Sequence, residues 1–168
     1  PLGGHRHHNL PAQLTSFVGR EREIDEIRRL VGVNRLVTLT GSGGCGKTRL
    51  AQEVVRRIAP SFSDGAAFVD LAPIQDPGRV PLAVGTTLGL RGGGKAAIEV
   101  LTGYFRDRQF LLALDNCEHL LDACTSLTSQ LLRGSAGLKI LATSREPLGV
   151  SGEQGFALSP LPLPPEHD

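Results

Sequence analysis

The chain has 168 residues, of which 40% are hydrophobic, and its 18 Lys and Arg against 17 Asp and Glu give a formal net charge of +1. A domain of this size buries about 70% of the surface of its unfolded chain, so one hydrophobic core is expected, whereas the balanced charge disfavours binding to nucleic acid or anionic lipid. No apolar run approaches the ~18 residues of a membrane helix, and three cysteines without a CxxC pair favour reduced thiols, so we expect a cytoplasmic protein.

The two ends of the chain differ in composition from the rest. Residues 1–14 contain Gly, Pro and His without apolar periodicity, and we expect a flexible lead-in or an expression remnant. Residues 160–168 are proline-rich and are expected to form a linker toward a further domain. The sequence between them, 15–159, is predicted to form one folded domain.

Strand and helix patterns alternate along 15–159. An amphipathic helix is expected from Arg20, followed by a β-rich run (Leu36 to Thr40), a glycine-rich loop and a helix that Pro60 closes. Further strands are predicted at "AAFVDLAP", "QFLLALDN", "LKILATSREP" and "EQGFALSP", with helices at 80–88, 96–105 and "CEHLLDACTSLTSQLLRG" between them. This alternation predicts an α/β doubly wound, mainly parallel sheet of about five strands with flanking helices.

The stretch "GSGGCGKT" follows the first predicted strand and opens a helix, which is the context of a phosphate-binding P-loop. Its glycines let backbone N–H groups converge on phosphate oxygens beside the positive end of the helix. We expect Lys47 to reach the β- and γ-phosphates and Thr48 to hold Mg²⁺ through its hydroxyl, while Cys45 is a small tolerated residue rather than a redox centre. The candidate phosphate-binding residues are Gly41, Ser42, Gly43, Gly44, Cys45, Gly46, Lys47, Thr48 and Arg49.

Two later strands end in polar residues at the edge where open α/β sheets bind ligands. Asp115 closes "FLLALD" and is predicted to be the second metal contact, although an Asp before a helix also suits an N-cap. Arg145 follows "LKILATS" and is predicted to face the γ-phosphate; its alternative is a surface arginine that starts the next turn.

With these residues assigned, the chain resembles the nucleotide-binding domain of the STAND class of signal-transduction ATPases, the NB-ARC-like group, and especially the modules of large bacterial regulators of the LuxR and antibiotic-regulatory-protein types. The resemblance rests on four segments in order: "FVGRERE", "GSGGCGKTRLA", "LLALDNCEHLL" and "LATSREPLGVSGE". It implies that Val18, Gly19 and Arg20 lie against adenine and ribose, that "LLALD" is the Walker B strand and that Arg145 is the sensor. It also implies a switch controlled by ATP or ADP, with further domains in a longer chain, DNA contact only through one of those domains, and nucleotide-dependent self-association.

One departure from such proteins bears on catalysis. Many relatives carry a second acidic residue directly after the Walker B Asp, whereas here that residue is Asn116, and an amide cannot act as a general base. Slow hydrolysis is therefore expected, an Asp at position 116 is expected to raise it, and Glu118 is the candidate substitute, unless it is simply a first-turn helix glutamate. The predicted catalytic set is Lys47, Asp115, Glu118 and Arg145.

Two other functions are open on sequence grounds. A motor-like or metabolic P-loop ATPase would sustain turnover, but its catalytic acid and arginine finger cannot be assigned. A GTPase is disfavoured because the sequence has no Asn-Lys-x-Asp segment to bind guanine.

Overall fold

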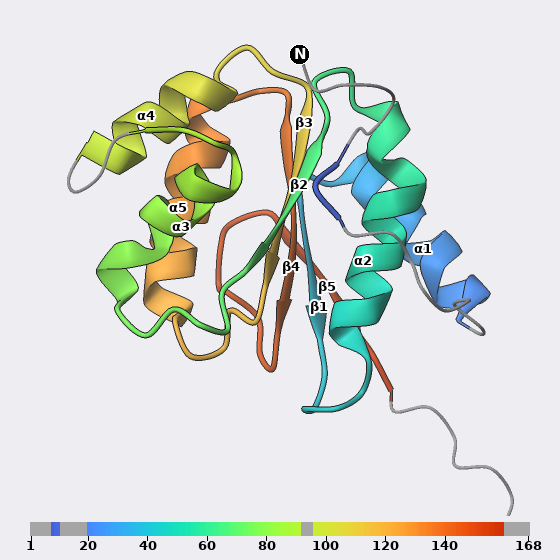
Figure 1. Ribbon diagram of the computed structural model, residues 1–168. Helices are drawn as coiled ribbons and strands as arrows, with labels where there is room; N and C mark the ends of the chain where they lie inside the picture. The colour runs from blue at the N-terminus through green and yellow to red at the C-terminus, as the bar shows by residue number, and fades with distance from the viewer. Residues whose placement is uncertain (1–7, 11–19, 92–95, 160–168) are drawn as a thin grey trace, which may run out of the picture.

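The computed structural model describes residues 8–10, 20–91 and 96–159 as an α/β domain built on one sheet (Figure 1). Its five strands run in the order β2-β3-β4-β1-β5, and every neighbouring pair is parallel. This arrangement confirms the predicted doubly wound fold. The strands are β1 (Leu36–Thr40), β2 (Ala66–Asp70), β3 (Phe110–Asp115), β4 (Leu138–Ser144) and β5 (Glu153–Ala157).

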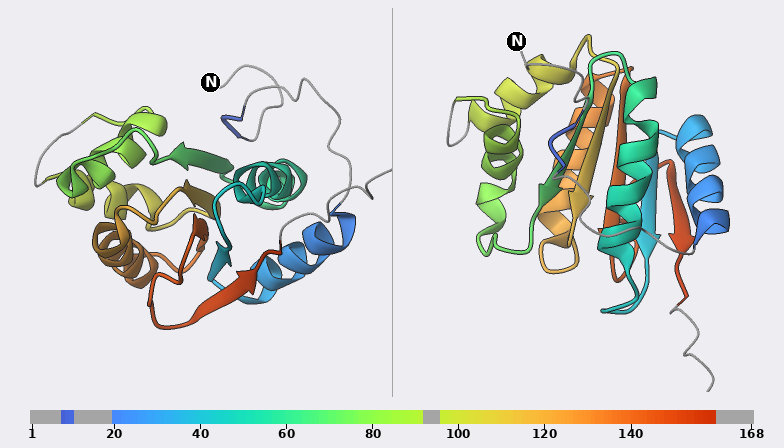
Figure 2. Two further views of the ribbon diagram at one scale, coloured as in Figure 1. Left: turned by 90° about the horizontal axis from the view of Figure 1, so that it is seen from below. Right: turned by 45° about the vertical axis from the view of Figure 1, so that its right-hand side comes forward.

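Helices cover both faces of the sheet, as Figures 1 and 2 show. On one face lie α1 (Glu21–Val33) and α2 (Lys47–Ile58), which ends in the 3-10 turn η1 (Ala59–Ser61). On the other face lie α3 (Val80–Thr87), α4 (Ala97–Phe105) and α5 (Leu121–Gly134), with the 3-10 turn η2 (Pro77–Arg79) before α3. None of the helices among the described residues is long and apolar enough to cross a membrane.

The sheet separates two hydrophobic clusters, and β3 contributes to both because its side chains alternate between the faces. Leu112 and Leu114 pack toward the face of α3 to α5, whereas Leu111 and Ala113 pack toward α1 and α2. All six residues of β3 are buried. Since full burial of a leucine side chain contributes about 1.5–3 kcal/mol, this strand anchors both layers and fixes the position of the residues that follow it.

The helix predicted from "CEHLL" begins later than expected. Helix α5 starts at Leu121, and its preceding residue, Leu120, has a non-helical backbone. Before it, the N–H of Cys117 donates to Thr143 O and the N–H of Leu120 donates to Cys117 O at 2.9 Å, so the chain makes a turn there. Glu118 therefore lies in a turn, and the alternative that it is a first-turn helix glutamate is wrong.

Part of the predicted lead-in packs on the domain. Asn9 pairs with edge strand β2, because its Nδ2 donates to Phe68 O at 2.9 Å and its Oδ1 accepts from the Phe68 N–H at 2.7 Å. Leu10 is 4% exposed and joins the cluster beneath α1 and α2. These bonds correct the expectation of flexibility for 8–10, whereas the predictions for 1–7, 11–14 and 160–168 fall outside the described residues.

Candidate functional site

The carboxyl ends of the parallel strands meet at one edge of the sheet, the lower edge in Figure 1, and the glycine-rich loop lies there. The loop joins β1 to α2, and Gly46 precedes the first turn of the helix. Gly44 and Gly46 have φ angles of 80° and 90°, a left-handed backbone that a residue with a Cβ seldom adopts. Glycine at these two positions turns the chain from strand to helix and leaves the positive end of α2 beside the loop.

Lys47, the first residue of α2, turns its ammonium group back onto the loop. Its Nζ donates to Gly41 O at 2.7 Å and to Ser42 O at 3.0 Å, and lies 3.9 Å from Cys45 Sγ. The residue is only 8% exposed, and no carboxylate of the described residues pairs with it. A cation bound only by neutral acceptors is well placed to exchange them for charged phosphate oxygens, which form stronger hydrogen bonds.

The P-loop threonine and the predicted Walker B aspartate meet directly. Thr48 Oγ1 donates to both oxygens of Asp115, at 3.1 Å to Oδ1 and 2.9 Å to Oδ2, although the two residues are 67 positions apart. Thr143, near the end of β4, also donates to Asp115 Oδ1, at 2.5 Å. Asp115 thus closes β3 next to the loop, and its alternative role as a helix N-cap is wrong because the helix starts at Leu121.

Asp115 is 1% exposed, and among the described residues no basic side chain pairs with it. Burial raises its pKa, the hydroxyls of Thr143 and Thr48 oppose this shift, and the nearby charges of Asp70 and Glu118 raise the pKa further. A buried carboxylate of this kind is stabilised by a cation, and oxygen donors suit Mg²⁺. The described residues contain no cluster of three or more His, Cys, Asp or Glu that could hold a metal, so a Mg²⁺ here would take its remaining ligands from phosphate and water.

Arg145 follows β4 and lies against the glycine-rich loop. A Cβ placed on Gly43 would be 3.1 Å from Arg145 Nη2, which shows how closely the guanidinium approaches the loop. Arg145 is exposed. The structure therefore places the predicted sensor next to the glycine-rich loop.

Arg20 donates a hydrogen bond to the backbone of the glycine-rich loop. Its Nη2 donates to Cys45 O at 2.8 Å and to Ser159 O at 3.1 Å, while its Nη1 is buried without a partner among the described residues. Cys45 is itself 5% exposed and packs in the core. The backbone of Arg20 is left-handed, with φ 61°. Val18 and Gly19 lie outside the described residues, so the predicted adenine contact of this segment stays a prediction.

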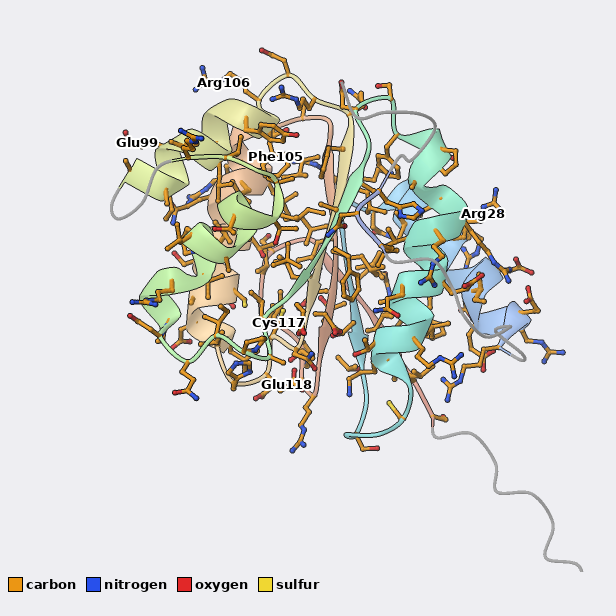
Figure 3. The ribbon with its side chains drawn as sticks, in the orientation of Figure 1. Arg28, Glu99, Phe105, Arg106, Cys117 and Glu118 are labelled. Carbon is orange, nitrogen blue, oxygen red and sulfur yellow. The ribbon has the colours of Figure 1, made fainter. Side chains whose placement is uncertain are left out.

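The remaining predicted site residues are more peripheral. Ser42 and Arg49 are exposed at the mouth of the loop and on the first turn of α2. Glu118 lies beside Cys117 in the turn after β3 (Figure 3), and its Oε2 is buried without a hydrogen-bond partner among the described residues. No hydrogen bond connects Glu118 to Thr48 or Asp115; its influence on Asp115 is electrostatic.

Sequence reasoning missed Asp70, the last residue of β2. Its carboxylate accepts a hydrogen bond from Asn116 Nδ2 at 3.1 Å, and the same Nδ2 donates to Asp115 Oδ2 at 3.0 Å. A usable signal was present, because the predicted strands "AAFVD" and "FLLALD" both end in Asp, and parallel neighbours bring such ends together.

A separate hollow of about 540 Å³ lies at the opposite, amino edge of the sheet, away from this site. It is bordered by the starts of β1 and β5 and by α5, and its lining includes Arg35, Leu36, Leu132, Arg133 and Val150. Two basic side chains at this edge bind the carbonyl ends of helices. Arg35 donates to Ser135 O after α5, and Lys139 donates to Val31 O and Gly32 O in the last turn of α1. Their placement is explained by helix capping.

No model of a known protein family matches the chain. An uncharacterized protein of Mycobacterium tuberculosis is 45% identical over 157 residues, which are 93% of this chain and 40% of that protein. A candidate HTH-type transcriptional regulator of the same species is 48% identical over 128 residues, 76% of this chain and 14% of the regulator. Regulatory protein AfsR of Streptomyces coelicolor is 32% identical over 158 residues, which cover 81% of this chain and 15% of AfsR. The chain therefore spans less than half the length of each of these relatives.

Two solved structures share this fold with the chain. A signal transduction ATPase with numerous domains (STAND) with a tetratricopeptide repeat sensor from Pyrococcus horikoshii has a TM-score of 0.59 and 19% identity, covering 88% of this chain and 24% of that one. Cdc6p from Pyrobaculum aerophilum has a TM-score of 0.62 and 14% identity, and the match covers 88% of this chain and 48% of Cdc6p. At such identities the likeness concerns the fold alone, and it agrees with the predicted α/β doubly wound sheet.

Proposed function

We propose that this domain binds ATP or ADP with Mg²⁺ and acts as a nucleotide-controlled switch in larger transcriptional regulators, with slow hydrolysis. The observation that carries the proposal is the contact of Thr48 with both oxygens of buried Asp115, beside a loop that holds the Lys47 ammonium. A threonine hydroxyl and a carboxylate on these two elements are the protein ligands that P-loop proteins use for Mg²⁺.

Each part of the site has a distinct task in this proposal. The backbone of Gly41 to Gly46, with Ser42 and Arg49 at its mouth, surrounds the phosphates, and Lys47 bonds the β- and γ-phosphates. Thr48 and Asp115 hold Mg²⁺, which when bound neutralises charge on the phosphate oxygens. The segment from Val18 to Arg20 lies on the adenine side.

The regulatory context is inferred from the relatives. One is named as a candidate HTH-type transcriptional regulator and another as a regulatory protein, and this chain corresponds to 14% and 15% of their lengths. We infer that further domains sense the signal and contact DNA, that the protein is cytoplasmic, and that this domain is of the NB-ARC-like type, with self-association that depends on nucleotide. Asn116 follows Asp115 directly, so the acid that many such ATPases carry at this position is absent, and this supports slow hydrolysis over sustained turnover.

The wild-type chain is the first test of the proposed function. Mg²⁺-ATP and Mg²⁺-ADP should each raise its melting temperature by several degrees, since ligand at about 100 times its dissociation constant contributes about 2.7 kcal/mol and a domain near this size shifts by about 2–4 °C per kcal/mol. Mg²⁺-GTP should give a smaller rise, and steady ATP turnover should stay below about 1 s⁻¹. Folded protein without any nucleotide shift would remove the proposal, and faster turnover would favour the motor-like or metabolic ATPase.

Arg145→Ala is expected to weaken ATP about tenfold while ADP changes by less than about twofold. The guanidinium lies against Gly43 of the loop, and a hydrogen bond to a charged group contributes about 1.5–3 kcal/mol, which only the γ-phosphate of ATP would supply here. Calorimetric dissociation constants for both nucleotides measure the difference, with Arg106→Ala, an exposed arginine after α4 (Figure 3), as the matched control. Equal losses for ATP and ADP would contradict the sensor role.

A further inference from the structure

The end of β2 brings a second carboxylate to the proposed nucleotide site. Asp70 is the last residue of β2, and in the parallel register it lies opposite Asp115, the last residue of β3. The backbones are also tied at this point, because the N–H of Leu71 donates to Asp115 O at 3.0 Å. The backbone that follows β2 is therefore hydrogen-bonded to Asp115, the residue that we assign to the metal.

Asn116 joins the two carboxylates. Its Nδ2 donates to Asp70 Oδ1 at 3.1 Å and to Asp115 Oδ2 at 3.0 Å, so the amide spaces the two negative groups. Its backbone has φ 64°, a left-handed conformation that Asn tolerates better than most residues, and its N–H donates to Thr143 Oγ1 at 3.0 Å. Asn116 thus has a defined position, and it orients Asp70 relative to Asp115.

Asp115 and Asp70 differ in whether a carboxylate oxygen is free to accept a hydrogen bond from solvent. Both oxygens of Asp115 accept hydrogen bonds, and the residue is 1% exposed. Asp70 is exposed, and its Oδ1 accepts from Asn116 and from the Ala72 N–H at 2.9 Å. Its Oδ2 accepts no hydrogen bond from the part of the chain that the structure describes, so Asp70 presents one carboxylate oxygen to solvent.

We propose, on the basis of the nucleotide-binding function inferred above, that Asp70 orients the water that attacks the γ-phosphate of ATP. In that step the water oxygen bonds to the γ-phosphorus, and the bond from this phosphorus to the oxygen that bridges to the β-phosphate breaks. The electron pair of the broken bond stays on ADP, and the proton released by water passes through Asp70 Oδ2 to solvent. Asn116 is a positioning residue in this step.

This assignment differs from the one that the sequence suggested. Glu118 is the nearest acidic residue in the sequence, but its Oε2 is enclosed by protein, and no hydrogen bond ties it to Thr48 or Asp115. Asp70 is 45 positions away in the sequence, yet a single amide connects it to Asp115. The proposal also changes the expectation for Asn116→Asp, since that change removes the amide donor and places a third carboxylate between two others.

The variant Asp70→Asn tests this inference, because it should lower the rate of ATP hydrolysis without weakening nucleotide binding. The variant should keep the dissociation constants of Mg²⁺-ATP and Mg²⁺-ADP within about twofold, while its single-turnover hydrolysis falls at least about tenfold, because a general base contributes about 10²–10⁴-fold. Asn116→Asp should lower the rate in the same direction. Glu118→Gln should lower the rate less than Asp70→Asn does. The matched control Asp107→Asn, at an exposed residue before β3, should keep the wild-type rate.

A second measurement does not depend on turnover. Aluminium fluoride added to the Mg²⁺-ADP complex imitates the transferring phosphoryl group and captures the attacking water, so it should raise the melting temperature beyond Mg²⁺-ADP alone in wild type and in Glu118→Gln. This additional rise should be absent in Asp70→Asn.

The outcomes distinguish the two proposals. Wild-type protein that binds neither nucleotide overturns both. Wild type that binds Mg²⁺-ADP but shows no additional rise with aluminium fluoride overturns the role of Asp70 and leaves nucleotide binding intact. The same holds if Asp70→Asn keeps both the rate and the fluoride effect, or if Glu118→Gln loses them.

Discussion

Replacing Lys47 with alanine is expected to remove most of the stabilisation that Mg²⁺-ATP gives this domain. The ammonium group lies against the carbonyls of Gly41 and Ser42, and its exchange onto phosphate replaces neutral hydrogen bonds by charged ones, each contributing about 1.5–3 kcal/mol. Loss of these contacts weakens ATP binding about 100-fold. At an ATP concentration of about 100 times the wild-type dissociation constant, the stabilisation then falls from about 2.7 to about 0.4 kcal/mol.

Differential scanning fluorimetry with and without Mg²⁺-ATP measures this loss for Lys47→Ala. The variant without nucleotide must be measured as well, because the contacts of Nζ to the loop also contribute to the free protein. Arg106→Ala removes the same charge from an exposed position and should keep the full wild-type shift. A wild-type shift in Lys47→Ala would show that the loop does not bind phosphate through this residue.

The sequence predicted the sheet well because its central strands are buried on both faces. The β-rich run predicted at Leu36 to Thr40 coincides with β1, and the near-continuous apolar run "FLLALD" is β3. Buried parallel strands tolerate few polar residues, so their limits are visible in the sequence. The glycine-rich loop was equally clear, because left-handed φ angles at Gly44 and Gly46 favour glycine at these positions.

The parts of the site that were missed depend on contacts between distant segments. Glu118 was assigned from its proximity in sequence to Asp115, but the chain turns at Cys117 before α5 begins, and the turn encloses one Glu118 oxygen. Asp70 was not assigned, because its meaning comes from the register of β2 with β3. The sequence shows that both strands end in Asp, but the structure is what shows that they are neighbours and that Asp70 lies opposite Asp115.

Asn116 shows how such contacts reverse an interpretation. From the sequence it is a missing acid, and Asp at this position is expected to restore hydrolysis. In the structure its amide donates to Asp70 and Asp115 at once, which no carboxylate can do. Asn116 therefore fixes the positions of Asp70 and Asp115 relative to each other.

Asp115→Asn is expected to stabilise the nucleotide-free fold at neutral pH and to weaken Mg²⁺-dependent binding. Burial raises the pKa of Asp115 in the folded protein, so its ionised form is disfavoured there relative to the unfolded chain. Wild-type stability therefore decreases as the pH rises from the ordinary aspartate pKa of about 3.9 through the higher pKa of the folded state. An amide carries no such charge, and its oxygen at the position of Oδ1 can still accept from Thr48 and Thr143. The variant loses the bond from Asn116 Nδ2 to Oδ2, but it avoids the cost of a buried negative charge, which we expect to be the larger effect.

Melting temperatures of wild type and Asp115→Asn from pH 3 to pH 8 measure the first effect, and the advantage of the variant should be largest at neutral pH and shrink below pH of about 3.9. ADP affinities in Mg²⁺ and in EDTA measure the second effect. Because the cation loses its charged protein ligand, the gain in affinity from Mg²⁺ should fall by at least the 10- to 100-fold typical for weakened metal sites. Asp107→Asn makes the same charge change at an exposed position before β3 and should alter neither quantity. A variant that melts below wild type at neutral pH yet keeps the full Mg²⁺ effect would show that Asp115 is a structural hydrogen-bond acceptor and that the metal is held elsewhere.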